Sequence, residues 1–525
     1  VKNDLLVKMN YRFDGTFMEQ HAEHFIELKL SSADEDSNET YLGLTDTDFA
    51  ASPYRRYAAS QVGNMDWQHD QVLLTYNLRT EQINWTTRVY NNEFERAWRK
   101  VNGFNPTGNT STDRTLQEIM ATPDDAINQG FYQVLTGQKD SEGSHEQLIV
   151  GTNDRNYHSR GVQTDLSLST DIFGLENIVH SGIRLHRDRI NRAHFEQNFL
   201  MQTGVMQADT LGPRFTTVNY EKADAISFYI EDSIKIDALQ LSLGARNERI
   251  DSRYQNRKAG MELDWLEKET SIWLYSLSGF YQLNEATGLF FGAHEGFVPT
   301  SPKQSPATQP ETSINYELGA RYNNGTTKLE SVLFLNDFDN LKESCSFSTA
   351  ASCTNEVLVD KEYNGGEVDV YGLEFNLASR VALNGELDLP WSVTYTYTES
   401  EFKQDLDSTF ELWGKVEAGA PVPYLPDHQL TLNLGLEATD WQINLLVKYI
   451  GEMQEAAGAD VALSGLATDA YTVVDLSANY YLGDWGSVYL KIDNLLDEVA
   501  LVSRRPFGAR PSKPQQWFVG YKYSF

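Results

Sequence analysis

Apolar and polar residues alternate with a period of two along most of this chain. Successive side chains of a β-strand point to opposite faces, so this period predicts strands with one apolar and one polar face. The last strand shows the pattern most clearly, with an apolar face made of Trp517, Val519, Tyr521, Tyr523 and Phe525. The same alternation recurs in the segments 239–246, 315–322, 372–377, 391–397, 430–436 and 441–449. Because none of these strands is apolar on both faces, we expect an interior that holds water or polar groups.

The links between the predicted strands alternate between short and long. Short turns are predicted at 14–16, 237–238, 284–288, 323–326, 437–440 and 483–486. Long links are predicted around 32–66, 100–155, 192–220, 297–311, 341–366, 400–423 and 452–469. Short turns at one end and long loops at the other are typical of transmembrane β-barrels. Within the longest link, the segment 115–130 is predicted to hold one or two short helices.

Composition supports one large barrel rather than several domains. A length of 525 residues would suggest three or four soluble domains, but no Pro- or Ser-rich linker divides the chain. We therefore predict an all-β fold, a transmembrane antiparallel β-barrel over residues 1–525. Aromatic residues make up 12% of the chain, as expected if two membrane interfaces are lined. No apolar run is long enough for a membrane helix, and a mean hydropathy of −0.47 is compatible with strands that alternate.

Charge and cysteine content narrow the choice of partners. The net charge of −32 disfavours nucleic acid, which requires a basic surface. The acidic run 31–40 is expected to be a solvated loop, and a divalent-ion-bridged contact with lipopolysaccharide is the alternative. Cys345 and Cys353 lie in one polar segment and are predicted to pair as a loop disulfide in an oxidising exterior. A metal site is the alternative, but it lacks further Cys or nearby His.

The end of the chain carries a family resemblance. The strand 488–492 closes on Asn494-Leu-Leu-Asp497, a loop with Arg505-Pro506 follows, and the final aromatic-rich strand ends in Phe525. This ending resembles the C-terminus of TonB-dependent outer-membrane receptors, where a terminal Phe is similar to the barrel-assembly signal. The resemblance implies a 22-stranded barrel with loops that face the cell exterior and lipid and lipopolysaccharide around it. About 19 strands can be counted here, so we expect the N-terminal plug domain and about three strands to lie outside this sequence.

Several segments resemble the branch of this family that contains the ferric dicitrate receptor. They are 39–49, 53–57, 182–192 and 503–510, with more widely shared similarity at 311–322 and 363–374. This resemblance implies uptake of a ferric chelate, either ferric citrate or a related carboxylate siderophore. It also implies energy from the TonB complex, which would act through the N-terminal region. It implies neither a cofactor nor catalytic residues.

Clustered arginines are the candidate ligand-binding residues. Iron held by citrate is an anion, and arginine forks grip carboxylates bidentately. The candidates are Arg55, Arg56, Arg184, His186, Arg187, Arg189, Arg504, Arg505 and Arg510, and the middle group is accompanied by Arg192 and His194. The alternative role is structural, because barrel walls carry Arg–Glu ladders and arginines that face a plug. The two histidines lack the ligand spacing of a closed metal site.

The sequence offers three alternatives to uptake of a ferric chelate. The cargo could be another siderophore, a cobalamin-like chelate, an oligosaccharide or a bare metal. A barrel without a plug could be a passive porin or an adhesin. An enzyme is disfavoured, because the chain has no nucleophile elbow, zinc motif or phosphate loop. The paired acids Asp124 and Asp125 fall in a predicted loop, where we expect them to be solvated.

Overall fold

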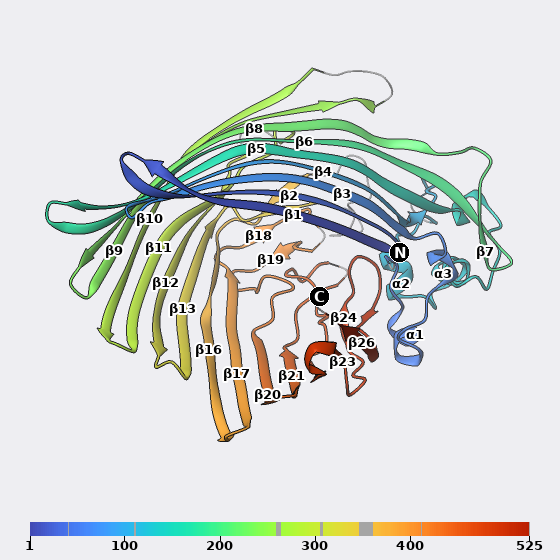
Figure 1. The fold of residues 1–525 in the computed structure, drawn as a ribbon. Helices are drawn as coiled ribbons and strands as arrows, with labels where there is room; N and C mark the ends of the chain where they lie inside the picture. Colours follow the sequence, from blue (N-terminus) through green and yellow to red (C-terminus); the bar gives the residue numbers. More distant parts are fainter. Residues whose placement is uncertain are drawn as a thin grey trace.

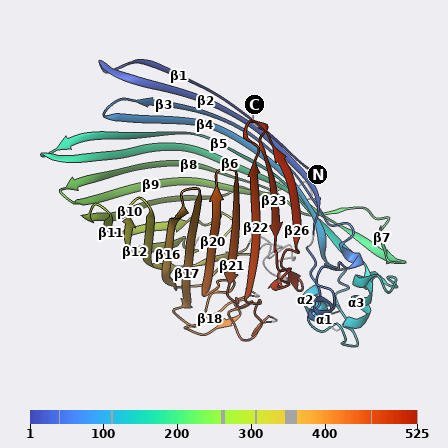
Figure 2. The ribbon, with the colours of Figure 1, turned by 60° about the horizontal axis from the view of Figure 1, so that its bottom comes forward.

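One curved antiparallel sheet dominates the structure (Figure 1; Figure 2). The structure is a computed structural model that describes residues 1–39, 41–109, 112–258, 264–304, 308–345, 361–410, 412–461 and 463–523. In this part of the chain the sheet has 20 strands, of which β7 (Val205–Ala208) is a four-residue piece. The others are β1 (Lys2–Phe17), β2 (Gln20–Asn38), β3 (Asn64–Arg79), β4 (Ile83–Phe104), β5 (Leu148–Ile172), β6 (Leu175–Gln202), β8 (Arg214–Ile236), β9 (Leu239–Asn256), β10 (Leu266–Asn284), β11 (Thr287–Val298), β12 (Glu311–Asn323), β13 (Thr327–Asp339), β16 (Val368–Asn384), β17 (Leu387–Phe402), β20 (His428–Ala438), β21 (Trp441–Ile450), β22 (Tyr471–Tyr481), β23 (Ser487–Asp493) and β26 (Gln516–Lys522).

Each long strand pairs with the next long strand along the chain, so the wall is a series of hairpins. Links of two to five residues alternate with links of 9 to 43 residues. We call the two ends of the wall the short-turn end and the long-loop end. This arrangement confirms the predicted alternation and the predicted number of strands. The long link 257–265, between β9 and β10, was not predicted.

Two sequence predictions about the first hairpin are wrong. Asp14-Gly15-Thr16 is not a turn, because β1 continues to Phe17. The turn is instead Met18-Glu19, where φ is 49° and 66°, as a two-residue hairpin turn of the I′ type requires. The acidic run 31–40 is not a loop either, since β2 extends to Asn38 and carries most of it. Alternating polar residues at the end of a long strand look like a loop when their pairing partners are unknown.

The two faces of the wall differ in polarity. On β6 and β8 the side chains of Ile183, Leu185, Ile226, Phe228 and Ile230 are exposed on the outer face. The opposite, inner face of the same strands carries polar residues, such as Ser233, whose hydroxyl lies 2.6 Å from that of Ser242 on β9. Among the residues that the structure describes, no helix is both long and apolar enough to cross a lipid bilayer.

The strands of the first half are much longer than a bilayer requires. β5 has 25 residues and β6 has 28, whereas about 9–11 residues of a tilted strand span the lipid. The long-loop halves of these strands therefore rise above the apolar belt. β10 also separates from β11 there, because the two strands pair only from Ser276 to Asn284 of β10.

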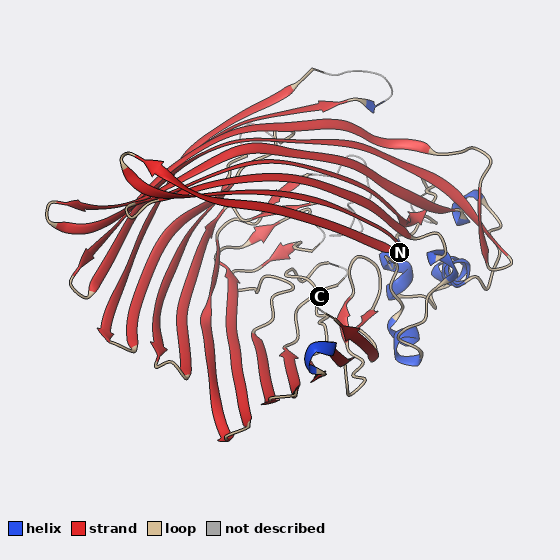
Figure 3. Ribbon diagram, viewed as in Figure 1, coloured by secondary structure: helices blue, strands red, loops and turns tan. Residues whose placement is uncertain are grey.

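Two small hydrophobic cores close the long-loop end. The first contains α1 (Asp46–Ala51), α2 (Leu116–Ala121) and α3 (Asn128–Thr136), which gather at one side of the wall (Figure 3). Helix α2 begins at a capping box of Thr115 and Glu118, which confirms the predicted helical segment. The short pairs β14 (Lys342–Ser344) with β15 (Glu362–Asn364) and β18 (Leu406–Asp407) with β19 (Lys415–Val416) surround the second core. Strands β24 (Leu501–Ser503) and β25 (Arg510–Pro511) form the base of the last long loop.

Candidate functional site

A group of basic side chains lies on the inner face of the wall near the long-loop end. Arg96 on β4 stands opposite Arg155 on β5, and Arg155 stands opposite Arg192 on β6. Lys100 lies four residues above Arg96 on the same face of β4, and His194 lies two residues above Arg192 on β6. We call these five residues the inner-wall cluster. Because like charges directly opposite in a sheet repel, three aligned arginines favour the presence of an anion.

Within the inner-wall cluster, Arg155 donates to two neutral groups. Arg155 Nε donates to His194 Nε2 at 3.0 Å, and its Nη1 donates to the hydroxyl of Tyr157 at 3.3 Å. Arg192 has an acidic neighbour, because its Nη1 lies 3.2 Å from an oxygen of Glu221. Its Nη1 also donates to Asn219 Oδ1 at 3.0 Å. Glu221 thus compensates part of the positive charge of the cluster, and Glu196 and Glu39 act on the charge of Lys100.

Aromatic rings line the cluster, and several buried hydrogen-bond donors beside them have no acceptor among the described residues. Lys100 is fully buried, and its Nζ lies 4.5 Å from the ring centroid of Trp98 and 5.1 Å from that of Tyr41. Arg96 Nε, Trp98 Nε1 and the Tyr41 hydroxyl are buried without a hydrogen-bond partner among the described residues. Each buried, unsatisfied donor costs about 1–3 kcal/mol. An acceptor-rich anion at this place would satisfy them.

Below the cluster, the predicted residues Arg184 and His186 belong to a closed network. Arg184 Nε donates to the hydroxyl of Tyr90 at 3.1 Å, and that hydroxyl lies 2.6 Å from His186 Nδ1. His186 Nε2 in turn lies 2.7 Å from a carboxylate oxygen of Asp188. These side chains share the inner face with Arg192, so the structure brings them to the same side as the inner-wall cluster.

The other two predicted arginines of β6 lie on the opposite face. Arg187 and Arg189 alternate with Arg184 and His186 and follow the exposed Ile183 and Leu185 along the outer face. Arg187 hydrogen-bonds Asp224 of β8. The structure therefore separates the arginines of this segment into two groups with different surroundings.

In the first long loop, the predicted Arg55 is bound to an internal acid. Its Nη1 lies 3.1 Å from Asp48 of α1, whereas Arg56 is exposed. Asp48 also accepts hydrogen bonds of 2.5 Å from the hydroxyls of Tyr57 and Tyr132. Burial disfavours the charged form of Asp48, but the hydrogen bonds from Tyr132 and Tyr57 and the charge of Arg55 outweigh it and lower its pKa. Asp48 thus ties α1 to α3.

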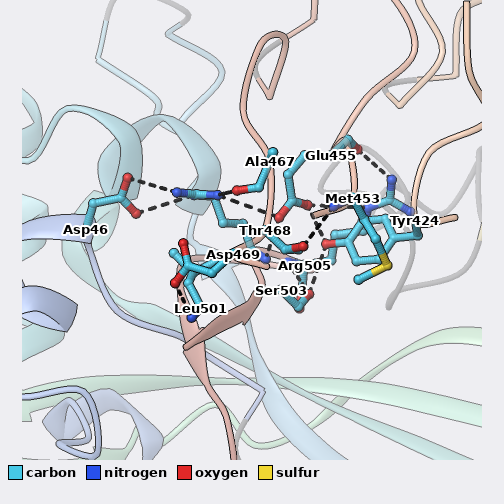
Figure 4. Close-up of polar contacts among 11 residues, drawn as sticks. Asp46, Tyr424, Met453, Glu455, Ala467, Thr468, Asp469, Leu501, Ser503 and Arg505 are labelled. Carbon is cyan, nitrogen blue, oxygen red and sulfur yellow. Dashed lines mark hydrogen bonds and ion pairs between the residues drawn. The ribbon is translucent and has the colours of Figure 1, made fainter. Parts of the chain in front are cut away.

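The predicted arginines of the last long loop also bind internal partners (Figure 4). Glu455, fully buried in the loop between β21 and β22, accepts a hydrogen bond from the backbone N–H of Arg504 at 3.0 Å and another from the hydroxyl of Tyr424. Arg505 Nη2 donates to the carbonyl of Glu455 at 2.6 Å, and its guanidinium lies 3.7 Å from the ring centroid of Tyr424. Arg504 reaches Asp46 of the first loop at 3.4 Å. We call Tyr424, Glu455, Arg504 and Arg505 the loop knot.

Burial sets the electrostatics of the loop knot. Desolvation raises the pKa of Glu455 above its ordinary value, although Tyr424 and Arg505 oppose this shift. Burial, together with the hydrogen bond to Glu455, raises the pKa of Tyr424 to about 12. Burial lowers the pKa of Arg505. A buried acid between two arginines joins three loops and compensates their charge internally.

Arg510, in the same loop as Arg504 and Arg505, connects this loop to the inner-wall cluster. Its guanidinium donates to the carbonyl of Tyr41, whose ring faces Lys100. Beyond them lies a cavity of about 490 Å³ that is lined by Asn102, Phe104, Arg114, Phe131, Glu196 and Arg214, among others. Asn102 Nδ2 and Arg214 Nη2 both donate to Glu196, at 2.9 and 3.0 Å.

The predicted disulfide joins Cys345 to Cys353. Cys345 is buried in the second core, whereas Cys353 lies outside the described residues, so their pairing stays a prediction. In the part of the chain that the structure describes, no three His, Cys, Asp or Glu side chains are grouped so that they could hold a metal ion.

Sequence reasoning missed three members of the inner-wall cluster, namely Arg96, Lys100 and Arg155. The signal was present for two of them, because Arg96, Trp98 and Lys100 recur at every second residue of β4. Their alignment with Arg155 and Arg192 depends on the strand register, which the sequence does not contain.

Comparison with known proteins identifies the family. The family model described as TonB dependent receptor-like, beta-barrel, matches residues 22–495. An iron-regulated outer membrane virulence protein of Vibrio cholerae is 32% identical over 202 residues, which are 37% of this chain and 28% of the relative. The ferrichrome outer membrane transporter/phage receptor of Escherichia coli K12 is 23% identical over 303 residues, which are 56% of this chain and 36% of the relative. The chain thus matches about a third of the length of these relatives.

Solved structures agree in fold. The unliganded ferric citrate transporter FecA aligns with a TM-score of 0.69 at 17% identity, over 99% of this chain and 69% of FecA. The ferric-catecholate import receptor Fiu of Escherichia coli K12 aligns with a TM-score of 0.67 at 13% identity, over 99% of this chain and 77% of Fiu. At these identities the likeness concerns the fold. The family match over most of the chain's length shows that the chain belongs to the TonB-dependent receptor-like β-barrels.

Proposed function

We propose that this barrel takes up an anionic ferric chelate, with ferric citrate or a related carboxylate siderophore as the cargo to test first. The observation that carries the proposal is the inner-wall cluster. In a chain of net charge −32, three arginines stand in register on the inner face, beside buried donors that no described residue accepts. Carboxylates bound to iron present the acceptor oxygens that such donors require.

The family supports the transport direction and the energy source. Since the chain belongs to the TonB-dependent receptors, we infer that uptake draws its energy from the TonB complex. Relatives and neighbours are named for ferric citrate, ferric catecholate and ferrichrome, so iron chelates are common to them although their chemistry differs. Arg184 and His186 lie below the cluster on the same face, where they would meet a cargo that has passed it.

Binding and uptake assays test this proposal. The complete receptor is titrated calorimetrically with ferric dicitrate, ferric catecholate and hydroxamate chelates, and metal-free citrate. We expect saturable binding of ferric dicitrate and no comparable binding of metal-free citrate. Cells that carry the receptor should accumulate ⁵⁵Fe from the bound chelate only when TonB is present. If only another ferric chelate binds, the proposed carboxylate cargo is wrong. If no ferric chelate binds, the proposal of iron uptake is refuted.

A further inference from the structure

The wall divides between β10 and β11. The two strands pair from the short-turn end only as far as Ser276, which stands opposite His294. Beyond this pair, residues 266–275 of β10 pair with β9, and the rest of β11 pairs with β12. We call residues 266–275 the open edge, and the space between it and β11 the gap. The long-loop end of the β9–β10 hairpin accordingly stands apart at the top of Figure 1.

The open edge lies above the part of β10 that is long enough to span the lipid. The paired part, from Ser276 to Asn284, matches the length of about 9–11 residues that a tilted strand needs. Unpaired backbone groups are not tolerated against lipid, because nothing there can hydrogen-bond them. Above the apolar belt, water or an added polypeptide can do so.

The open edge directs backbone hydrogen-bonding groups into the gap. In an antiparallel strand the N–H and C=O of one residue point to the same side, and successive residues alternate. The N–H of Tyr275 crosses the gap and donates to a carboxylate oxygen of Glu295 at 2.9 Å. By the same alternation, the backbone groups of four further residues face the gap, namely Glu267, Glu269, Ser271 and Trp273. No described residue donates to or accepts from these groups.

The usual protection of a sheet edge is absent from residues 266–275. Proteins protect edges with prolines, bulges or charged side chains. This stretch has no proline, and its ladder with β9 has no bulge. Its charged side chains are engaged elsewhere, since Arg249 of β9 lies 3.0 Å from Glu269 and Lys268 donates to the carbonyl of Thr308 at 3.1 Å. A strand can therefore be added here without displacing a partner.

The side chains around the gap favour a basic segment with apolar residues. A cavity of about 290 Å³ spans the gap, and its lining includes Ile272, Trp273 and Leu274 of β10 and Glu295, Asp337 and Asp339 of the facing strands. Asp337 lies 3.6 Å from Lys403, whereas Glu295 and Asp339 form no ion pair with a described residue. Charge complementarity therefore selects a cationic partner, and the exposed ring of Trp273 offers an apolar contact.

We propose that the open edge binds an extended, basic peptide segment of another protein, which adds to the wall as a strand. Its backbone would pair with the groups that face the gap. A Lys or Arg side chain would meet Glu295 and Asp339, and an apolar side chain would lie against Trp273. In such complexes the main-chain hydrogen bonds supply affinity, and pockets for alternate side chains supply specificity. The inference is independent of the cargo in the interior.

The test measures binding of two synthetic peptides to the complete receptor in detergent. One is an alternating Lys-Val peptide with the length of the open edge, and the other is the matched Glu-Val peptide. Fluorescence anisotropy should show saturable binding of the Lys-Val peptide, and binding of the Glu-Val peptide should be weaker on the order of tenfold because like charges meet. Residue-resolved hydrogen exchange should slow at the gap-facing amides of Glu267, Glu269, Ser271 and Trp273 when the Lys-Val peptide binds.

Substitutions at Ser271 separate the backbone contact from the side chain. Ser271→Pro removes an N–H that points into the gap but no hydrogen bond of the ladder with β9. Peptide affinity should therefore fall on the order of tenfold. Ser271→Ala keeps this N–H and is the matched control, with unchanged affinity. Asp339→Asn should weaken binding of the Lys-Val peptide several-fold, and it does not depend on the assembly of the proline variant.

Four results would overturn the proposal. The first is a failure of the Lys-Val peptide to bind, or equal binding of the Glu-Val peptide. The second is an affinity that both Ser271→Pro and Asp339→Asn leave unchanged. The third is slow exchange of the gap-facing amides in the peptide-free receptor, which would mean that the edge pairs within the chain. The fourth is a receptor dimer in native mass spectrometry that Ser271→Pro dissociates, which would assign the edge to a second copy of the chain.

Discussion

The inner-wall cluster and the loop knot are both rich in arginine, but they differ in what surrounds the charge. In the loop knot, Glu455 is fully buried between Arg504 and Arg505, and Tyr424 packs against the guanidinium of Arg505. In the inner-wall cluster, Arg96, Arg155 and Arg192 face one another, and Glu221 pairs with Arg192. A group of arginines that a buried acid compensates holds a structure together, whereas a group that is compensated only in part is suited to an external anion. The number of arginines in a segment does not distinguish the two cases.

The largest expected effect concerns the loop knot. Glu455→Leu keeps the volume but leaves two arginines without their acid, and removal of one partner from a buried ion pair costs about 3–5 kcal/mol. Hydrogen exchange should accelerate in residues 451–470 and 501–505. Glu452→Gln, at an exposed position three residues earlier, is the control and should leave exchange unchanged. The double variant Glu455→Leu/Arg505→Leu should recover part of the loss, and protection unchanged by Glu455→Leu would show that the knot is not structural.

Asp48 is a second compensated site and should depend on pH. Asp48→Asn removes a charged acceptor of two tyrosines, which we expect to weaken the contact between α1 and α3 by about 1–3 kcal/mol. Because the folded-state pKa of Asp48 lies below its ordinary value of 3.8, its contribution is present above that pH and is lost as the pH falls through the folded-state pKa. Proteolysis of the first loop, measured from pH 7 to pH 3, should increase at the acidic end in the wild type. A variant whose acid sensitivity equals that of the wild type would contradict this role.

A substitution in the capping box of α2 tests whether the helices at the long-loop end are stabilised independently of the loop knot. Thr115→Ala removes the side chain that caps the N–H of Glu118, with an expected cost of about 1 kcal/mol. Hydrogen exchange should accelerate in 116–121 and remain unchanged in the loop knot. Thr115→Ser retains the cap and serves as the control. Faster exchange throughout both cores would mean that the two parts of the mouth are coupled.

The smallest effect should have the opposite sign. Arg155→Met removes the central arginine of the aligned row, and relief of cross-strand repulsion is worth about 0.2–1 kcal/mol. The ligand-free barrel should therefore melt at the same or a slightly higher temperature. Arg246→Met is the control, because Arg246 is paired with Glu248 on the same inner face and its removal should not stabilise the barrel. Marked destabilisation by Arg155→Met would place Arg155 with the structural arginines.

The sequence predicted the barrel well because a local period of two determines which residues share a face. It also predicted one or two short helices within 115–130, where α2 begins at a capping box and α3 starts. The sequence-based prediction failed where the pairing partners of a residue are far away along the chain. Asp14-Gly15 is a favourable turn sequence, but Gly15 pairs with Ala22 inside the ladder and the turn forms at Met18-Glu19.

The candidate site shows the same limit. Arg184, Arg187 and Arg189 look like one cluster in the sequence, yet their alternation places them on two faces of β6. Arg96 and Arg155 are 59 residues apart and meet only through the register of β4 and β5. Glu455 gave no signal as the partner of Arg505, because the loops that carry them come together only in the folded mouth.

The most direct measurement is a paired calorimetric titration of the complete receptor with ferric dicitrate, in which Arg155→Ala is compared with Arg505→Ala. If the inner-wall cluster holds the anion, Arg155→Ala should weaken binding at least tenfold, as expected for loss of a charge-assisted contact. Arg505→Ala should change loop protection more than it changes affinity. The reverse result, with affinity lost in Arg505→Ala and kept in Arg155→Ala, would place the anion in the loop knot and contradict the account.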